Sequence, residues 1–137
     1  HWQDESLTVV QGKIGAQILG EPPTFHGVGE TVTFKRGVAH KFWNAGEELL
    51  VCRGMASPAY NLEYFLTEIF HSTKANGGKI PSVLDAAFLQ RTYQSEFDMV
   101  EMPAFVKKIL LPLLFVVGKW MGTHRKFAGA PQPLTVS

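Results

Sequence analysis

The sequence predicts an α+β protein in which antiparallel strands come first and helices follow. Up to residue 57, short apolar and β-branched runs are separated by glycines, which is typical of strands. After Pro58 the apolar residues repeat with helical spacing over longer runs. The chain has 137 residues, 45% of them hydrophobic, which is enough to build a core. Strands followed by helices, rather than alternating with them, define the α+β class.

Several short strands are expected in the first part of the chain. They cover residues 7–10, 14–19, 31–35, 40–44 and 49–55. The first two are expected to pair around a tight turn at Gly12 and Lys13. Residues 21–29 contain two prolines and two glycines, so they are expected to form a loop. Short strands at such intervals are typical of a sandwich or barrel.

Two helices are expected between Pro58 and residue 102. An apolar stripe at i, i+3, i+4, i+7 and i+8 predicts the first, which ends before Asn76. This stripe consists of Leu62, Phe65, Leu66, Ile69 and Phe70. Ser82, with Asp85 three residues later, resembles a capping box and opens a second helix through Arg91.

A third helix is expected from Pro103, kinked at Pro112 and ending near Gly118 or Gly122. Residues 105–121 are apolar nearly all round, with three lysines among them. Burial against the barrel or in a dimer interface is the favoured interpretation, and contact with a membrane surface is the disfavoured one. The apolar run over residues 109–117 is too short to span a bilayer, which takes about 20 residues.

Composition excludes several classes of protein. The net charge of +1 attracts no polyanion, and no polar recognition helix follows a short glycine turn, so we expect no nucleic-acid partner. The charge is uneven, because residues 1–102 hold 8 basic and 12 acidic side chains and the remainder holds 5 basic and none acidic. The lone Cys52 excludes an intrachain disulfide and a cysteine-rich zinc site, and fits a reducing, cytoplasmic location.

Chemistry concentrates in two short stretches with regular spacing. The first consists of His1, Glu5 and Gly12, and the second of Gly29, Lys35, Gly37, His40 and Asn44. Residues four apart on a strand share a face, so His1 and Glu5 are expected to point the same way. Imidazoles and a carboxylate that converge suit a divalent transition metal better than calcium or magnesium.

These two stretches resemble the paired motifs of the cupin superfamily, small jelly-roll barrels that usually carry one metal. In the second motif Lys35 stands where the family usually has proline. The resemblance implies an antiparallel β-barrel over residues 1–57, a helical extension over 58–127 packed on the barrel or on a dimer partner, and a flexible tail over 128–137. It also implies one metal ion (Fe, Mn, Ni, Zn or Cu) held by His1, Glu5 and His40.

The family's first motif carries another histidine two positions before residue 1, and the opening strands of the barrel precede it. We therefore expect the sequence to be the retained part of a longer chain, with the N-terminal part of the barrel missing. A second ligand set is also open: if residue 1 were a processed N-terminus, its amine and imidazole together would chelate copper.

The predicted pocket wall consists of Gln3, Phe42, Asn44 and Arg53. Phe42 shares the strand parity of His40, whereas Trp43 is expected to face outward. Arg53 would grip an anionic ligand if it faces inward, and outward is the commoner case. His26, His71 and His124 are expected to lie at the surface, and Cys52 to act as a small core residue.

Two classes of function remain open after the sequence. One is a metal-dependent enzyme of oxygenase or isomerase type, with open positions on the metal for substrate. The other is a non-catalytic cupin that binds or senses a small molecule. No carboxylate besides Glu5 has the parity and spacing of a general base, so the sequence does not decide whether the protein is an enzyme. In both cases we expect a small-molecule ligand and a homodimer.

Overall fold

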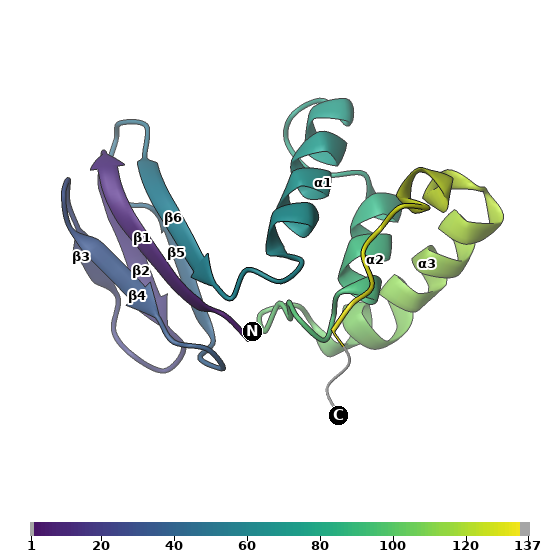
Figure 1. The fold of residues 1–137 in the computed structure, drawn as a ribbon, viewed down its shortest axis with the longest axis horizontal. Helices are drawn as coiled ribbons and strands as arrows, with labels where there is room; N and C mark the ends of the chain where they lie inside the picture. Colours follow the sequence, from purple (N-terminus) through teal and green to yellow (C-terminus); the bar gives the residue numbers. More distant parts are fainter. Residues whose placement is uncertain (1, 135–137) are drawn as a thin grey trace. The chain divides into compact units, whose positions relative to one another are not determined.

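The structure is a computed structural model that describes residues 2–134. It confirms the α+β class, with antiparallel strands followed by helices (Figure 1). The chain divides into two compact units, which we call the strand unit, ending at Ala59, and the helical unit, beginning at Tyr60. Within residues 2–59 there is no helix, as the strand pattern predicts.

The strand unit consists of two three-stranded antiparallel sheets and not of a closed barrel. One sheet has the strand order β4-β1-β6 and the other β3-β2-β5. All the expected strands are present, and a short additional strand, β3, lies within the predicted loop over residues 21–29. The strands are β1 (Asp4–Gln11), β2 (Ile14–Ile18), β3 (Thr24–His26), β4 (Thr31–Phe34), β5 (His40–Asn44) and β6 (Val51–Ser57).

The predicted pairing of the first two strands is wrong, because β1 and β2 are the middle strands of different sheets. Gly12, at a φ of +80°, carries the chain from one sheet to the other, and a Cβ there would lie 2.9 Å from the Leu49 carbonyl oxygen. Val9 on β1 and Ile14 and Ala16 on β2 are at most 1% exposed. Burying both apolar faces takes two sheets that cover each other, which one hairpin cannot provide.

The helical unit is built on an aromatic core. Its helices are α1 (Leu62–Ala75), α2 (Val83–Thr92), the π-helical turn η1 (Val106–Leu110), α3 (Leu111–Trp120) and the 3₁₀ turn η2 (Thr123–Phe127). The core consists of Phe65, Leu89, Tyr93, Phe97 and Phe127. Tyr93 is fully buried, and its hydroxyl donates a hydrogen bond to the Pro131 carbonyl at 2.8 Å.

Helix α2 begins after Ser82, but the predicted capping box is wrong, since the Ser82 side chain makes no capping hydrogen bond. Asp85 is buried and accepts hydrogen bonds from Ser72 Oγ and Lys126 Nζ, both at 2.6 Å. Ser72 Oγ in turn accepts the Ser82 N–H at 2.9 Å. A buried carboxylate needs such donors, so tertiary contacts replaced the local cap and tie α1, α2 and η2 together.

A second buried carboxylate, that of Glu96, holds the C-terminal segment. It accepts hydrogen bonds from the Asn61 backbone and side chain at 3.2 and 2.7 Å and from the Leu134 backbone at 3.0 Å. Asn61 Nδ2 also donates to the Gln132 carbonyl at 2.9 Å. Residues 131–134, part of the predicted tail, are thus held by hydrogen bonds, and residues 135–137 lie outside the described part of the chain.

The third predicted helix is interrupted by a π-helical turn, η1, just before Pro112. The Leu111 N–H bonds back to Val106, and the chain leaves α3 at Gly122 with a φ of +72°. One side of α3 packs on α2, where the Phe115 and Phe88 rings stack with their centroids 5.9 Å apart. Among residues 2–134 no helix is long and apolar enough to cross a bilayer.

Changing Tyr93 to Phe is expected to remove a sensitivity to alkali. Burial, followed by the nearby charges of Tyr64 and two glutamates, raises the pKa of Tyr93 to about 12 from its usual 10.0. The neutral hydroxyl therefore stabilises the fold fully below the usual pKa, and this contribution is lost as the pH rises through the raised pKa.

At neutral pH the Phe variant should be less stable by about 1 kcal/mol, the worth of the lost hydrogen bond. One pH unit above the usual tyrosine pKa, this difference should shrink by about 1.4 kcal/mol. Urea unfolding of both proteins at the two pH values measures it. A difference that does not change with pH would contradict the buried, hydrogen-bonded hydroxyl.

Neighbouring leucines on α3 should respond in opposite ways to the same substitution. Leu114 is partly buried, whereas Leu113 is 58% exposed. Leu114→Asp should lower the free energy of unfolding by about 2–3 kcal/mol, because it places a charge against packed apolar side chains. Leu113→Asp should change it by less than about 0.5 kcal/mol. Equal melting temperatures of the two variants would show that the packed side of α3 is assigned wrongly.

Candidate metal and ligand site

The structure brings together two of the residues that the motifs single out, Glu5 and His40. Glu5 lies on β1, where it pairs with Phe34 of β4 and Ala56 of β6, and His40 is the first residue of β5 in the other sheet. His40 Nε2 lies 3.5 Å from Glu5 Oε2. The side chains are 7% and 19% exposed, respectively. A carboxylate from one sheet thus meets an imidazole from the other in a mostly buried place.

The His40 ring is fixed in orientation by two further contacts. Its plane stacks on the Phe34 ring, with centroids 3.9 Å apart and an angle of 5° between the planes. Its Nδ1 lies 2.9 Å from the Val38 carbonyl oxygen, which can only accept a hydrogen bond. Nδ1 therefore carries a proton, and Nε2 is the atom presented to Glu5.

The electrostatics of the pair favour a charged imidazole. Burial by itself lowers the pKa of His40, but the hydrogen bonds with the Glu5 carboxylate and the Val38 carbonyl outweigh burial, so that the pKa is raised from the usual 6.5. The positive charge that Glu5 stabilises here is that of a proton on Nε2. A metal cation between Nε2 and the carboxylate would meet the same electrostatic demand.

Next to Glu5, Asp4 points to the other face of β1 and binds Arg36. The Asp4 carboxylate accepts the Arg36 backbone N–H at 2.9 Å and the guanidinium Nη2 at 3.2 Å. The Arg36 side-chain hydrogen bond, followed by the backbone one, lowers the pKa of Asp4 below its usual 3.8. This contact joins β1 to the turn that follows β4 and so helps to fix the strands that carry Glu5 and Phe34.

Gln3 carries a buried polar atom without a partner. Two residues before Glu5 and on the same face of the chain, Gln3 is 1% exposed. Its Nε2 donates to the Ala59 carbonyl at 3.4 Å, but Oε1 has no hydrogen-bond partner among residues 2–134. An orphaned buried oxygen is rare in native proteins and often marks a place for a water, ion or ligand. Gln3 therefore fits the predicted role of a pocket residue.

The other predicted residues lie in different places. His1 lies outside the described residues. Phe42 is on the inner face of β5, with its ring 6.5 Å from that of Phe34, and half of its surface is exposed. Asn44 donates to the Glu48 carbonyl at 2.7 Å and accepts the Gly46 N–H at 3.0 Å, so its amide closes the loop after β5. Arg53 is exposed on β6, on the face opposite to Glu5.

The prediction that Trp43 faces outward agrees with its placement. Its ring covers Gly15 on the outer face of the sheet, where a Cβ on Gly15 would overlap it, and lies edge-on to Phe25 with centroids 6.3 Å apart. His26 sits near Thr24 on β3, away from the Glu5–His40 pair. His124 is partly buried, with Nε2 3.2 Å from the Leu84 carbonyl oxygen, and not at the surface as expected.

The metal-ligand set is incomplete in the described part of the chain. Within residues 2–134 no three His, Cys, Asp or Glu side chains are grouped closely enough to hold a metal. Glu5 and His40 supply one oxygen and one nitrogen donor, a set that suits a transition metal. Further donors would have to come from His1, the Gln3 carbonyl oxygen or solvent.

Two functional contacts were missed in the sequence. Phe34 is the residue that stacks on His40, and its signal was available, because the alternation in Thr31–Phe34 places it on the same inner face as Val32. The Val38 carbonyl has no signal of its own, since every residue carries a carbonyl. Only the turn over Lys35–Val38, closed by a 3.2 Å hydrogen bond, aims it at the ring.

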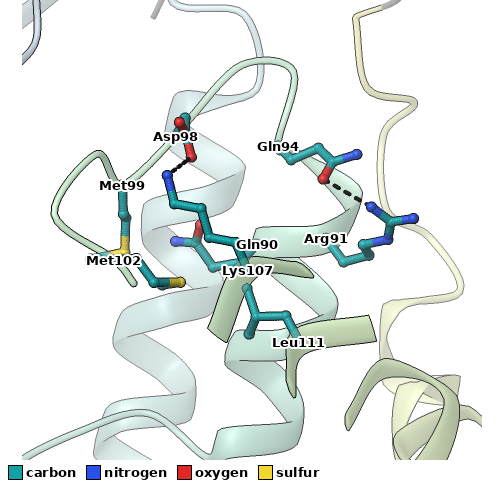
Figure 2. Close-up of a pocket in the computed structure, with 8 residues that line it drawn as sticks. All are labelled: Gln90, Arg91, Gln94, Asp98, Met99, Met102, Lys107 and Leu111. Atoms are coloured by element: carbon teal, nitrogen blue, oxygen red, sulfur yellow. Dashed lines mark hydrogen bonds and ion pairs between the residues drawn. The ribbon is translucent and has the colours of Figure 1, made fainter. Parts of the chain in front are cut away.

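A hollow in the helical unit is the other candidate, and Figure 2 shows its lining. It is lined by Gln90, Arg91, Gln94, Asp98, Met99, Met102, Lys107 and Leu111. Its charged groups already bind neighbours: Lys107 Nζ lies 2.7 Å from Asp98 Oδ1, and Arg91 Nη1 donates to Gln94 Oε1 at 3.0 Å. With these groups satisfied, the hollow offers a ligand mainly the two methionines, so the Glu5–His40 pair remains the stronger candidate.

Comparisons with protein-family models, with curated proteins and with solved structures gave no match to this chain. The argument for function therefore depends on the residues themselves.

Replacing Gln3 with Met is expected to leave the ligand-free protein at least as stable. The substitution keeps the volume close and removes an unpartnered buried oxygen, whose desolvation costs about 1–3 kcal/mol, against one long hydrogen bond. Urea unfolding should place the variant within about 1 kcal/mol of the parent, or above it. A loss of several kcal/mol would mean that Oε1 is satisfied in solution and marks no site.

Proposed function

We propose that the strand unit is a metal-binding pocket of cupin type that holds a small molecule. Glu5 and His40 are the proposed ligands within the described chain, with His1 as the third. The observation that carries the proposal is the Glu5–His40 contact, which joins residues 35 positions apart from two different sheets. The motif resemblance predicts that these two side chains converge, and nothing in their local sequence would otherwise require it.

The residues around the pair have distinct roles in this proposal. Val38 holds Nδ1 protonated, so Nε2 is the nitrogen that binds the metal once its proton has left. Phe34 keeps the imidazole plane fixed and, with Phe42, provides an apolar wall for the ligand. Gln3 Oε1 is placed to accept a hydrogen bond from the ligand or a water. A bound transition metal would supply a Lewis acid with open coordination positions.

Binding or sensing is favoured over acid–base catalysis by the state of the nearest other carboxylate. Asp4 is held by Arg36 on the opposite face, so it does not serve as a general base beside Glu5. An oxygenase or isomerase reaction on the metal is the second candidate, because such reactions can proceed with the metal as the main reactive group. Homodimer formation stays a prediction for either function.

The metal assignment is tested by elemental analysis of protein purified without a metal-affinity step. His40→Ala should lower metal occupancy by at least about tenfold, because it removes a proposed ligand. His26→Ala removes an imidazole from the same unit and should leave occupancy unchanged. Equal occupancy in the two variants would remove His40 from the metal site.

The choice between binding and catalysis needs a second measurement. Native mass spectrometry of the purified protein detects a retained small molecule, and oxygen uptake with a reconstituted metal detects turnover. Retention of an unmodified ligand, lost in Gln3→Met, supports the binding role. Oxygen consumption that depends on His40 supports the enzyme instead.

A further inference from the structure

One side of η1 and α3 presents a row of apolar side chains to solvent. We call this row the apolar stripe; it consists of Phe105, Ile109, Leu113, Val116 and Trp120. Their exposed fractions run from 56% to 88%, with Trp120 the most exposed. Spacings of three and four residues place all five on one side of the helix. Soluble proteins rarely leave so large an apolar surface without a partner.

The apolar stripe is not the side of α3 that packs in the helical unit. Phe115 stacks on Phe88 of α2, and the His124 ring covers the buried Gly118. These residues lie between the stripe positions in sequence and point the other way. Figure 1 shows α2 along one side of α3 only. The sequence favours core or dimer packing for this segment, and the packed side accounts for only half of its apolar surface.

Uncompensated positive charge surrounds the stripe. Lys108 and Lys119 are exposed on one flank of the helix, and Arg125 is exposed on η2. The sequence has no acidic residue after Glu101. The nearby acids Asp98 and Asp85 are bound by other lysines, and within residues 2–134 no ion pair forms to Lys108, Lys119 or Arg125. The surface is therefore apolar at its centre and cationic at its edge.

We propose that the apolar stripe and its flanking cations bind the surface of an anionic lipid bilayer, with the helix lying in the plane of the interface. Helices of this kind carry aromatic and aliphatic side chains on one face and lysines beside it, and they do not cross the membrane. Each lysine near an anionic surface strengthens binding by about fivefold. The proposal is independent of the metal site.

Charge also argues against a second copy of the chain as the occupant. In an antiparallel two-fold pair the same flank of both helices meets, which brings Lys108 towards Lys119 of the partner subunit. A parallel pair places the lysines against the opposite flank, which has no acidic residue either. Neither arrangement neutralises the lysines, whereas an anionic bilayer does.

The test is flotation of the full chain with vesicles of phosphatidylcholine mixed with phosphatidylserine, compared with vesicles of phosphatidylcholine alone. We expect flotation with the mixed vesicles that weakens at high salt and falls sharply without phosphatidylserine. Trp120→Ser and Leu113→Asp should abolish it, and Lys108→Glu combined with Lys119→Glu should reduce it at least tenfold. Trp120 emission should shift to the blue on binding.

Matched controls separate the stripe from general effects. Phe70→Ser removes an exposed aromatic residue from α1, and Lys74→Glu combined with Lys79→Glu reverses two charges elsewhere in the helical unit. Both controls should float like the parent, and circular dichroism should show that every variant is folded. Absence of flotation by the parent, or equal flotation of stripe and control variants, would overturn the proposal. So would a parent dimer that Leu113→Asp dissociates and that does not float.

Discussion

The strand unit depends on mutual burial of two central strands. β1 and β2 each sit in the middle of a three-stranded sheet, and their inward residues, such as Val9 and Ile14, have no surface left for water. Each small sheet alone would expose one apolar face, and covering that face is the main free-energy gain available to it. The chain makes the connection at Gly12, where a side chain would collide with the Leu49 carbonyl.

This arrangement determines what happens at the end of the same inner faces, where polar residues replace apolar ones. Glu5 and His40 lie there in opposite sheets, and a buried charge is tolerated only with a partner. The Phe34 ring continues the apolar interior up to the imidazole. The contact between Glu5 and His40 is therefore the place where the interior changes from apolar packing to polar chemistry.

The helical unit shows how the same chain treats buried acids that have a structural role. Asp85 and Glu96 are each surrounded by donors, with every hydrogen bond between 2.6 and 3.2 Å. Gln3 differs, because one end of its amide is buried and has no partner in the described chain. Against a background of satisfied polar groups, this exception gives the strand unit its functional signal.

Local periodicity predicted most of the secondary structure and little of the tertiary pairing. The strand over residues 40–44 and the helix from Leu62 follow directly from alternation and helical spacing. The pairing of β1 with β4 and β6 was not predictable from a short glycine turn, because burial of two faces overrides local turn preference. Likewise, Asp85 matched a capping pattern, yet Ser72 and Lys126 hold it through contacts that only folding creates. At the site, motif spacing predicted the meeting of Glu5 and His40, whereas the Val38 carbonyl contact has no sequence signature.

The hydrogen bonds of Glu96 have a topological consequence. One carboxylate binds Asn61, just after the helical unit begins, and Leu134, at the last described position of the chain. The two ends of residues 61–134 therefore lie within the reach of a single side chain. Neighbouring ends are the geometric condition for circular permutation and for insertion of a module into a loop of another protein. The helical unit meets that condition, since a short linker from Leu134 to Asn61 would close it into a ring without moving α1 or α2.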